Sequence, residues 1–194
     1  MMLEKTKRIL AISGSTRSNS INQSILKAIA RRYPESLAVE LYEELSLLPH
    51  FNPDLDKQAV AQTVANLRTR IAQADGVLIC TPEYVFSLPG ALKNALEWTV
   101  STPVFYNKPV ALITASGLGE KAHESLLLIM QTLQAKIGIH STMLIQGASS
   151  KVSKQGEITD PDTMKDIERL MDSFMETMQE NRQAASQDDF IANK

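Results

Sequence analysis

The sequence has a single cysteine and no long apolar run. Of its 194 residues only Cys80 is a cysteine, so a disulfide within the chain is excluded and a reducing cytoplasm is the expected location. No apolar stretch reaches the roughly 20 residues that a membrane-spanning helix needs. The first residues, Met1–Arg8, lack the apolar core of a secretion signal. We therefore expect a cytoplasmic protein without a membrane span.

The chain also lacks an excess of charge of either sign. Its formal net charge is −2, from 20 Lys and Arg residues against 22 Asp and Glu residues. A basic surface that would attract nucleic acid is therefore not expected. Apolar residues make up 43% of the chain, which is ordinary for a globular protein, and the length suits one α/β domain. We expect this domain over residues 1–179 and a polar C-terminal tail over residues 180–194.

The common phosphate-binding signatures are missing. There is no Gly-Lys-Ser/Thr ending of a nucleotide P-loop, no G-x-G-x-x-G, and no cysteine that would serve a phosphatase in such a loop. The chain does contain Gly14-Ser-Thr-Arg-Ser-Asn-Ser-Ile-Asn22, which lies between the apolar run Ile9–Ile12 and a helical pattern from Ile21. A strand-to-helix turn offers free backbone N–H groups, and Arg17 adds a planar charged fork. These residues predict a loop that holds a phosphate monoester without attacking it.

Helix capping is the alternative explanation of the same residues. Ser and Asn are preferred at the N-cap, so part of the run could serve only to begin a helix. Capping needs one or two such residues, however, and it does not need Arg17 together with four hydroxyls between Ser15 and Ser20. We therefore favour phosphate binding.

Apolar segments alternate with helical patterns along the whole chain. We expect strands at Ile9–Ile12, Leu37–Tyr42, Gly76–Thr81, Val110–Ala115 and Thr142–Ile145. A helical pattern follows each of them, and the helix after the fourth strand is expected over Ala122–Lys136. The last helix is expected to begin with Asp160 as N-cap and Pro161 as its first residue, and to end near Met178. This order predicts an α/β protein with a doubly wound parallel sheet and helices on both faces.

Three loops follow strands and would meet at one edge of this sheet. They are Gly14–Asn22, Pro82–Ser87 and Ser116–Gly119. Doubly wound sheets bind ligands beyond the carboxyl ends of their strands. The first loop suits a phosphate, the second offers aromatic rings and backbone, and the third offers backbone amides. A phosphate joined to a flat ring system would satisfy all three loops.

Two motifs make the sequence resemble the NADPH-dependent FMN reductase family of flavodoxin-like proteins, which includes quinone, azo-dye and chromate reductases. The first motif is Gly14-Ser15-x-Arg17-x-x-Ser20-x-Asn22. The second is Pro82-Glu83-Tyr84-x-x-Ser87-x-Pro89-Gly90-Ala91-Leu92-Lys93-Asn94-Ala95-Leu96-Glu97-Trp98. The resemblance extends from about Arg8 to about Met178. It implies a flavodoxin-like sandwich whose five parallel strands lie in the order 2-1-3-4-5.

The resemblance also implies which residues bind the cofactor FMN. Its phosphate would be held by Ser15, Thr16, Arg17, Ser20, Ile21 and Asn22. Its ring would be lined by Pro82, Glu83, Tyr84, Val85 and Phe86, mostly through backbone, and approached from the other edge by Ser116 and Gly117. The family usually has Asn at the position of Val85. This departure implies a reduction potential of the flavin, or a substrate preference, that differs from that of other members. No metal ligand and no catalytic acid or base is expected.

The activity that the resemblance implies is an oxidoreductase reaction. NADH or NADPH would pass a hydride to bound FMN. The nicotinamide would then leave, and an acceptor such as a quinone, free flavin, azo compound or oxidised metal ion would bind in its place. Relatives imply a homodimer or homotetramer. Two alternatives stay open: an electron carrier of the flavodoxin type, which the nearly neutral charge disfavours, and a non-enzymatic FMN-binding interaction protein, for which Val85 is the only support.

Overall fold

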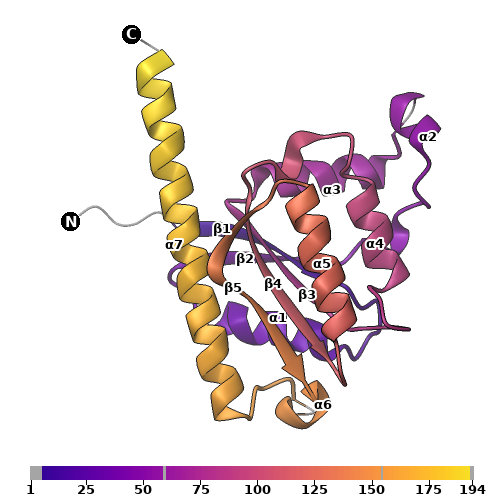
Figure 1. Cartoon of the computed structure of the whole chain (residues 1–194), viewed down its shortest axis with the longest axis vertical. Helices are drawn as coiled ribbons and strands as arrows, with labels where there is room; N and C mark the ends of the chain where they lie inside the picture. The colour runs from indigo at the N-terminus through magenta and orange to yellow at the C-terminus, as the bar shows by residue number, and fades with distance from the viewer. Residues whose placement is uncertain (1–5, 59, 154, 193–194) are drawn as a thin grey trace.

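A five-stranded parallel sheet forms the centre of the computed structural model, which describes residues 6–58, 60–153 and 155–192. Its strands are β1 (Lys7–Ser13), β2 (Leu37–Tyr42), β3 (Gly76–Thr81), β4 (Pro109–Ser116) and β5 (Lys136–Gln146). Neighbouring strands pair in the order β2-β1-β3-β4-β5, and every pair is parallel (Figure 1). The predicted flavodoxin-like strand order is therefore confirmed.

Strand β3 shows why the central strands are apolar without alternation. Val77 and Ile79 point into the core on one face of the sheet, and Leu78 and Cys80 point into the core on the other face. Because both faces are covered, every residue of β3 is buried.

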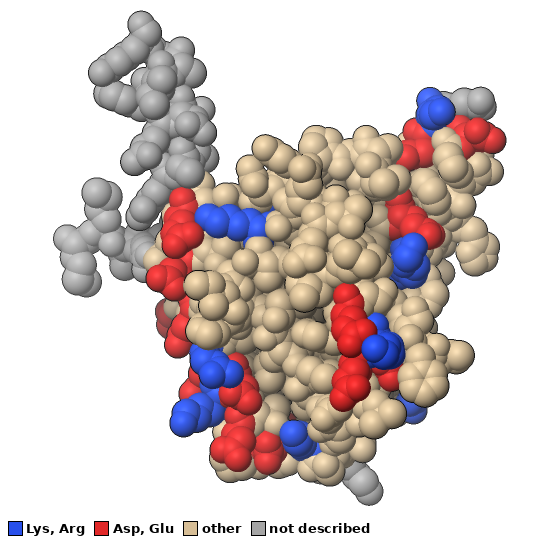
Figure 2. All heavy atoms as spheres, viewed as in Figure 1, with Lys and Arg blue, Asp and Glu red and all other residues tan. Residues whose placement is uncertain are grey.

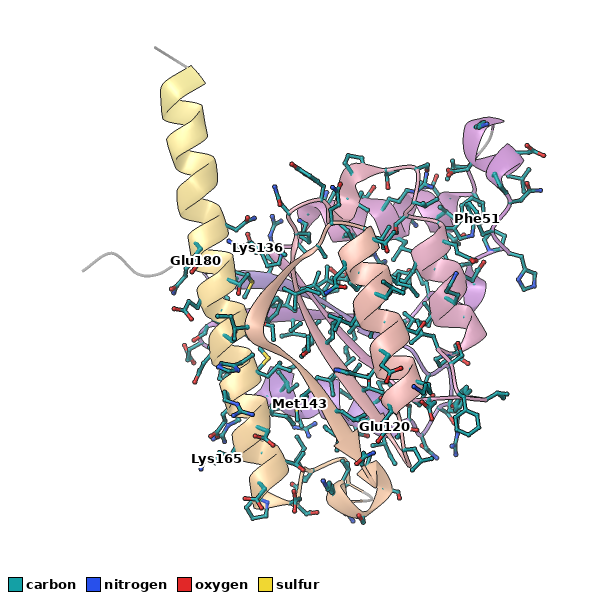
Figure 3. All side chains as sticks on the ribbon, in the orientation of Figure 1. Phe51, Glu120, Lys136, Met143, Lys165 and Glu180 are labelled. Atoms are coloured by element: carbon teal, nitrogen blue, oxygen red, sulfur yellow. The ribbon has the colours of Figure 1, made fainter. Side chains whose placement is uncertain are left out.

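Helices cover both faces of the sheet. The face that contains Leu78 is covered by α1 (Ile21–Arg32) and α7 (Pro161–Ala192), whereas α3 (Gln62–Gln73), α4 (Gly90–Glu97) and α5 (Glu120–Thr132) cover the opposite face. The short elements are η1 (Leu45–Leu47), α2 (Pro53–Gln58), η2 (Pro103–Phe105) and α6 (Ala148–Lys151). Figure 3 shows Lys136 of β5 close to Glu180 of α7, where the two side chains form an ion pair at 3.2 Å. Within the described ranges, no helix is long and apolar enough to cross a bilayer.

The last helix begins as predicted but is longer. The Asp160 carboxylate accepts hydrogen bonds from the Thr163 backbone N–H at 2.9 Å and from its hydroxyl at 2.6 Å, which confirms the predicted cap. The helix continues past Met178 to Ala192, since residues 162–192 contain neither glycine nor proline. The predicted boundary between residues 179 and 180 falls inside this helix, and the division into domain and tail stays a prediction. Residues 1–5 and 193–194 lie outside the described part.

Two other boundaries differ from the sequence prediction. The helix expected to reach Lys136 ends at Thr132, because Gln134 adopts a left-handed backbone with φ of 58°. Strand β5 consequently begins at Lys136 instead of Thr142, and its pairing with β4 shifts register between Val110 and Leu112.

Replacing Gly76 tests how tightly α7 packs on the sheet. A Cβ at this position would lie 2.6 Å from Cζ of Phe174, whose ring is fully buried. We expect Gly76→Ala to lower the free energy of unfolding by about 1–3 kcal/mol, measured by urea denaturation. The control is Gly90→Ala at the start of α4, where a Cβ would have no atom within 4 Å and the stability should hold or rise slightly. Equal losses in both variants would contradict this packing.

Candidate functional site

The loop between β1 and α1 presents unused backbone donors at the start of a helix. Ser20 is the N-cap of α1, and its hydroxyl oxygen accepts a hydrogen bond from Gln23 N at 3.4 Å. Within the described chain, no hydrogen bond is made by the backbone N–H groups of Ser18, Asn19, Ile21 or Asn22. Such N–H groups at a helix N-terminus bind anions. The loop therefore performs capping and still keeps donors for a phosphate.

The first half of the loop is held by its own serines. Ser13 Oγ donates to the Ser15 carbonyl at 3.1 Å and accepts from Ser15 N at 3.3 Å. Ser15 Oγ in turn accepts from Arg17 N at 3.4 Å. Ser15 and Ser20 are buried, whereas Thr16 and Arg17 are exposed. No acidic partner of Arg17 occurs among the residues that the structure describes, so its guanidinium is available to a ligand.

The side chain of Asn22 turns toward the sheet. Its Nδ2 donates to the Ala115 carbonyl at 3.3 Å, and its Oδ1 accepts from the Cys80 thiol at 3.2 Å. Burial raises the pKa of the Cys80 thiol, which stays protonated as a donor. The amide of Asn22 thus ties the start of α1 to β3 and β4, and the geometry supports a phosphate contact only from its backbone N–H.

Gly14 lets the loop begin close against β3. Its backbone N–H donates to the Cys80 carbonyl at 2.8 Å. A Cβ on Gly14 would lie 2.7 Å from Cβ of Thr81 and 2.9 Å from a methyl group of Leu92. A larger residue would push the loop away from the sheet, so glycine sets the distance between this loop and β3.

The second loop contains a tight turn. Tyr84 N donates to the Ser87 carbonyl at 3.0 Å, and Ser87 N donates to the Tyr84 carbonyl at 3.1 Å. Val85 and Phe86 lie between them with φ values of 51° and 55°. Pro82 is buried below the turn, whereas the side chains of Tyr84, Val85 and Phe86 are exposed.

Glu83 joins the second loop to the third. One carboxylate oxygen accepts from Gly119 N at 3.3 Å, and the other accepts from Ala122 N at 3.0 Å. Glu83 N donates to Ser116 Oγ at 3.2 Å. Gly119, the N-cap of α5, has no side chain to accept these bonds, so the carboxylate of Glu83 caps α5 from another loop. This capping role has no signal in the local sequence.

The third loop leaves room beside its backbone. A Cβ on Gly117 would have no atom within 4 Å, so a ligand could approach the chain there. His123 lies just behind the loop in α5, with Nδ1 3.0 Å from Thr114 Oγ1. Burial lowers the pKa of this imidazole, so His123 is neutral at neutral pH.

A small polar cavity, which the sequence did not predict, adjoins the loop between β1 and α1. It has a volume of about 160 Å³ and is lined by Ser13, Ser15, Thr16, Arg17, Ser18, Gln23, Tyr42, Glu43, Leu45 and Ser46. The Tyr42 hydroxyl is buried and has no hydrogen-bond partner in the described part of the chain. Its burial and the neighbouring Glu44 raise the pKa of Tyr42 to about 12. The hydroxyl of Tyr42 is therefore neutral at neutral pH.

The structure brings all three predicted loops to the carboxyl edge of the sheet. Figure 3 places Glu120, the first residue of α5, at the end toward which the strand arrows point. Free N–H donors, an unpaired Arg17 and an open backbone at Gly117 fit a group with a phosphate at one end and a flat ring at the other. Within the described ranges, no cluster of His, Cys, Asp and Glu could hold a metal ion.

Comparison with known proteins gives one consistent result. The family described as NADPH-dependent FMN reductase matches residues 7–149. An NADH:(hydroxy)cinnamate reductase subunit from Vibrio ruber is 31% identical over 86% of this chain and 84% of its own. A quinone reductase from Escherichia coli is 31% identical over 92% of this chain and 98% of its own. FerB, a flavoenzyme NAD(P)H:(acceptor) oxidoreductase from Paracoccus denitrificans, has a TM-score of 0.75 and 27% identity, and the match covers 91% and 99% of the two chains.

Replacing Glu83 tests the link between the second and third loops. In Glu83→Gln an amide NH₂ would face the N–H of Gly119 or Ala122, so one of these donors would lose its acceptor. We expect the free energy of unfolding to fall by about 1–3 kcal/mol and the two amides to exchange hydrogen faster. Glu124→Gln is the control, because Glu124 is exposed and pairs only with Lys121 at 2.8 Å, so its loss should cost under about 0.5 kcal/mol. Unchanged exchange at both amides would exclude the capping role.

Proposed function

The chain belongs to the NADPH-dependent FMN reductase family, and on that basis we propose that it is an FMN-dependent NAD(P)H oxidoreductase that reduces a small acceptor. The acceptor would be a quinone, free flavin, azo compound or oxidised metal ion. For a quinone, NAD(P)H, a proton and the quinone become NAD(P)⁺ and the hydroquinone. The relatives named above as quinone and (hydroxy)cinnamate reductases support this reaction class.

The observation that carries the proposal is the set of free donors at the start of α1. Among the described residues, four backbone N–H groups of the loop form no hydrogen bond and the exposed Arg17 forms no ion pair, so the loop can supply these donors to a phosphate monoester. We propose that the phosphate is held by Ser15, Thr16, Arg17, Ser20, Ile21 and Asn22, the last through its N–H. The ring would be lined by Pro82, Glu83, Tyr84, Val85, Phe86, Ser116 and Gly117.

The residues of the chain position the reactants and do not supply reactive groups. When bound, FMN would supply the hydride-transfer and electron-transfer chemistry that links the nicotinamide to the acceptor. Glu83 fixes the second loop on the third through its three hydrogen bonds. Its carboxylate is engaged in capping, and His123 is held by Thr114, so we assign no catalytic acid or base.

Partners and location belong to the same proposal. We propose a homodimer or homotetramer, supported by the run Ser125–Ala135 of α5 and its following loop, which contains no charged residue and includes the exposed Leu128. Figure 2 shows charged side chains at the start of α5 and along α7, with an uncharged surface between them. The buried single Cys80 suits a reducing cytoplasm, and the net charge of −2 supports the absence of a nucleic acid partner.

Purified protein mixed with FMN tests the reaction directly. We expect FMN to be bound, and NADH or NADPH to be oxidised when a quinone is added. Flavin fluorescence, denaturing release of the flavin and absorbance at 340 nm measure these steps, and the sedimentation coefficient of the same sample gives the oligomeric state. Binding of FMN without oxidation of NAD(P)H would support an electron carrier or a non-enzymatic protein instead.

Replacing Arg17 tests the phosphate site. A charge-assisted hydrogen bond contributes about 1.5–3 kcal/mol, so Arg17→Ala should weaken FMN binding roughly 10- to 150-fold. Riboflavin has no phosphate, and its affinity should hardly change. Arg169→Ala is the control, because Arg169 is an exposed residue of α7 that pairs with Asp166 in the same helix. Equal effects of Arg17→Ala on both flavins would remove Arg17 from the phosphate site.

A further inference from the structure

The turn at Val85 and Phe86 departs from what such turns normally contain. Both residues have left-handed backbones, with φ of 51° and 55°. A two-residue turn of this kind strongly prefers Asn or Asp followed by Gly, which adopt positive φ readily. A β-branched residue such as valine adopts it with strain. The chain therefore keeps an unfavourable pair of residues at this point.

The side chains of the same two residues are also unusually exposed. Val85 is 96% exposed and Phe86 is 70% exposed. Neither side chain is used to pack the fold, and exposure of apolar surface to water is itself unfavourable. Backbone strain and apolar exposure thus coincide at one turn, which indicates a function for these side chains.

The turn is anchored at its base and carries no charged side chain of its own. The paired hydrogen bonds of Tyr84 and Ser87 close the turn, and Glu83 anchors its base on α5. Leu118 of the anchored third loop is also exposed. Residues 84–92 and 109–119 contain no charged side chain. The turn itself therefore offers an anchored apolar surface without a charged group.

We propose that Val85 and Phe86 determine which acceptor is reduced, by favouring uncharged planar aromatic acceptors over charged ones. The assignment rests on the function proposed above. The backbone of the turn faces the flavin ring in this proposal, and the outward side chains of Val85 and Phe86 contact the acceptor. A quinone bound there gains two electrons and two protons and becomes a hydroquinone, while NAD(P)H and a solvent proton supply the hydride and the second proton.

The first test measures the turn without any cofactor. Asparagine and glycine tolerate positive φ, so Val85→Asn and Val85→Gly should raise the melting temperature of the apo protein by about 2–4 °C. The matched control is Ile139→Asn, because Ile139 is a β-branched residue that is 93% exposed without a left-handed backbone. Its melting temperature should not rise. A melting temperature that is unchanged or lower in both Val85 variants would overturn the interpretation that the turn is strained.

The second test compares 1,2-naphthoquinone with its 4-sulfonate, which differs by one negative charge. Loss of apolar contact at Val85 should lower the ratio of kcat/KM for the uncharged over the sulfonated quinone by about 5- to 10-fold in Val85→Asn. Phe86→Ser should lower it at least as much, and Ile139→Asn should leave it unchanged. The comparison of ratios between variants cancels the different potentials of the two quinones.

The possible outcomes separate this assignment from the proposed function. Wild-type protein that oxidises NAD(P)H with none of the proposed acceptors overturns both. Wild-type protein that reduces another of these acceptors but neither quinone overturns the specificity assignment alone. Wild-type protein that reduces them, with the same ratio in Val85→Asn and Phe86→Ser, overturns the specificity assignment alone. A changed sedimentation coefficient in Val85→Asn would make the turn a subunit contact and would also overturn it. A lowered ratio at constant sedimentation coefficient supports it.

Discussion

The buried amide of Asn22 holds together the parts of the chain from which the candidate site is built. It joins the first turn of α1 to the ends of β3 and β4 through Cys80 and Ala115. A buried polar side chain without partners would cost about 1–3 kcal/mol, and here both ends of the amide are bonded. The first turn of α1 is therefore fixed in height and direction relative to the sheet.

Glu83 anchors the second loop on the third loop, as Asn22 anchors the first turn of α1 on the sheet. Its carboxylate and N–H make three hydrogen bonds to the segment from Ser116 to Ala122. Loops that are ordered before a ligand arrives lose less conformational entropy when it binds. The two links act at different depths, since Asn22 is buried and Glu83 is half-buried. Together they connect the three loops to the ends of β3 and β4 and to α5.

The strand order and the position of the loop between β1 and α1 were predictable because their signals are local. Continuous apolar strands, helical spacing and the residues Gly14–Asn22 are read within short windows. The roles of Asn22 and Glu83 were not predictable, because their partners are distant in sequence. The partners of Asn22 lie 58 and 93 positions away along the chain, and those of Glu83 lie 36 and 39 positions away. The end of α5 was missed for a different reason. Gln134 adopts a left-handed backbone, which glutamine does not normally favour. Strand β5 therefore begins earlier in the chain than predicted.

The way the chain treats its other left-handed positions sets the Val85 turn apart. Among the described residues, positive φ otherwise occurs at Gly119, Gly147 and Gly156, where it costs nothing, and at Asn107 and Gln134, which have polar side chains. Only the turn between β3 and α4 combines positive φ with a β-branched and an aromatic residue. Natural sequences break local rules of this kind mainly where function requires it. Glu83 anchors the base of this turn on the third loop and α5, which opposes relief of the strain by movement of the loop. The exposed apolar side chains are thereby held in one orientation beside the site, which is the condition for a turn to discriminate between acceptors.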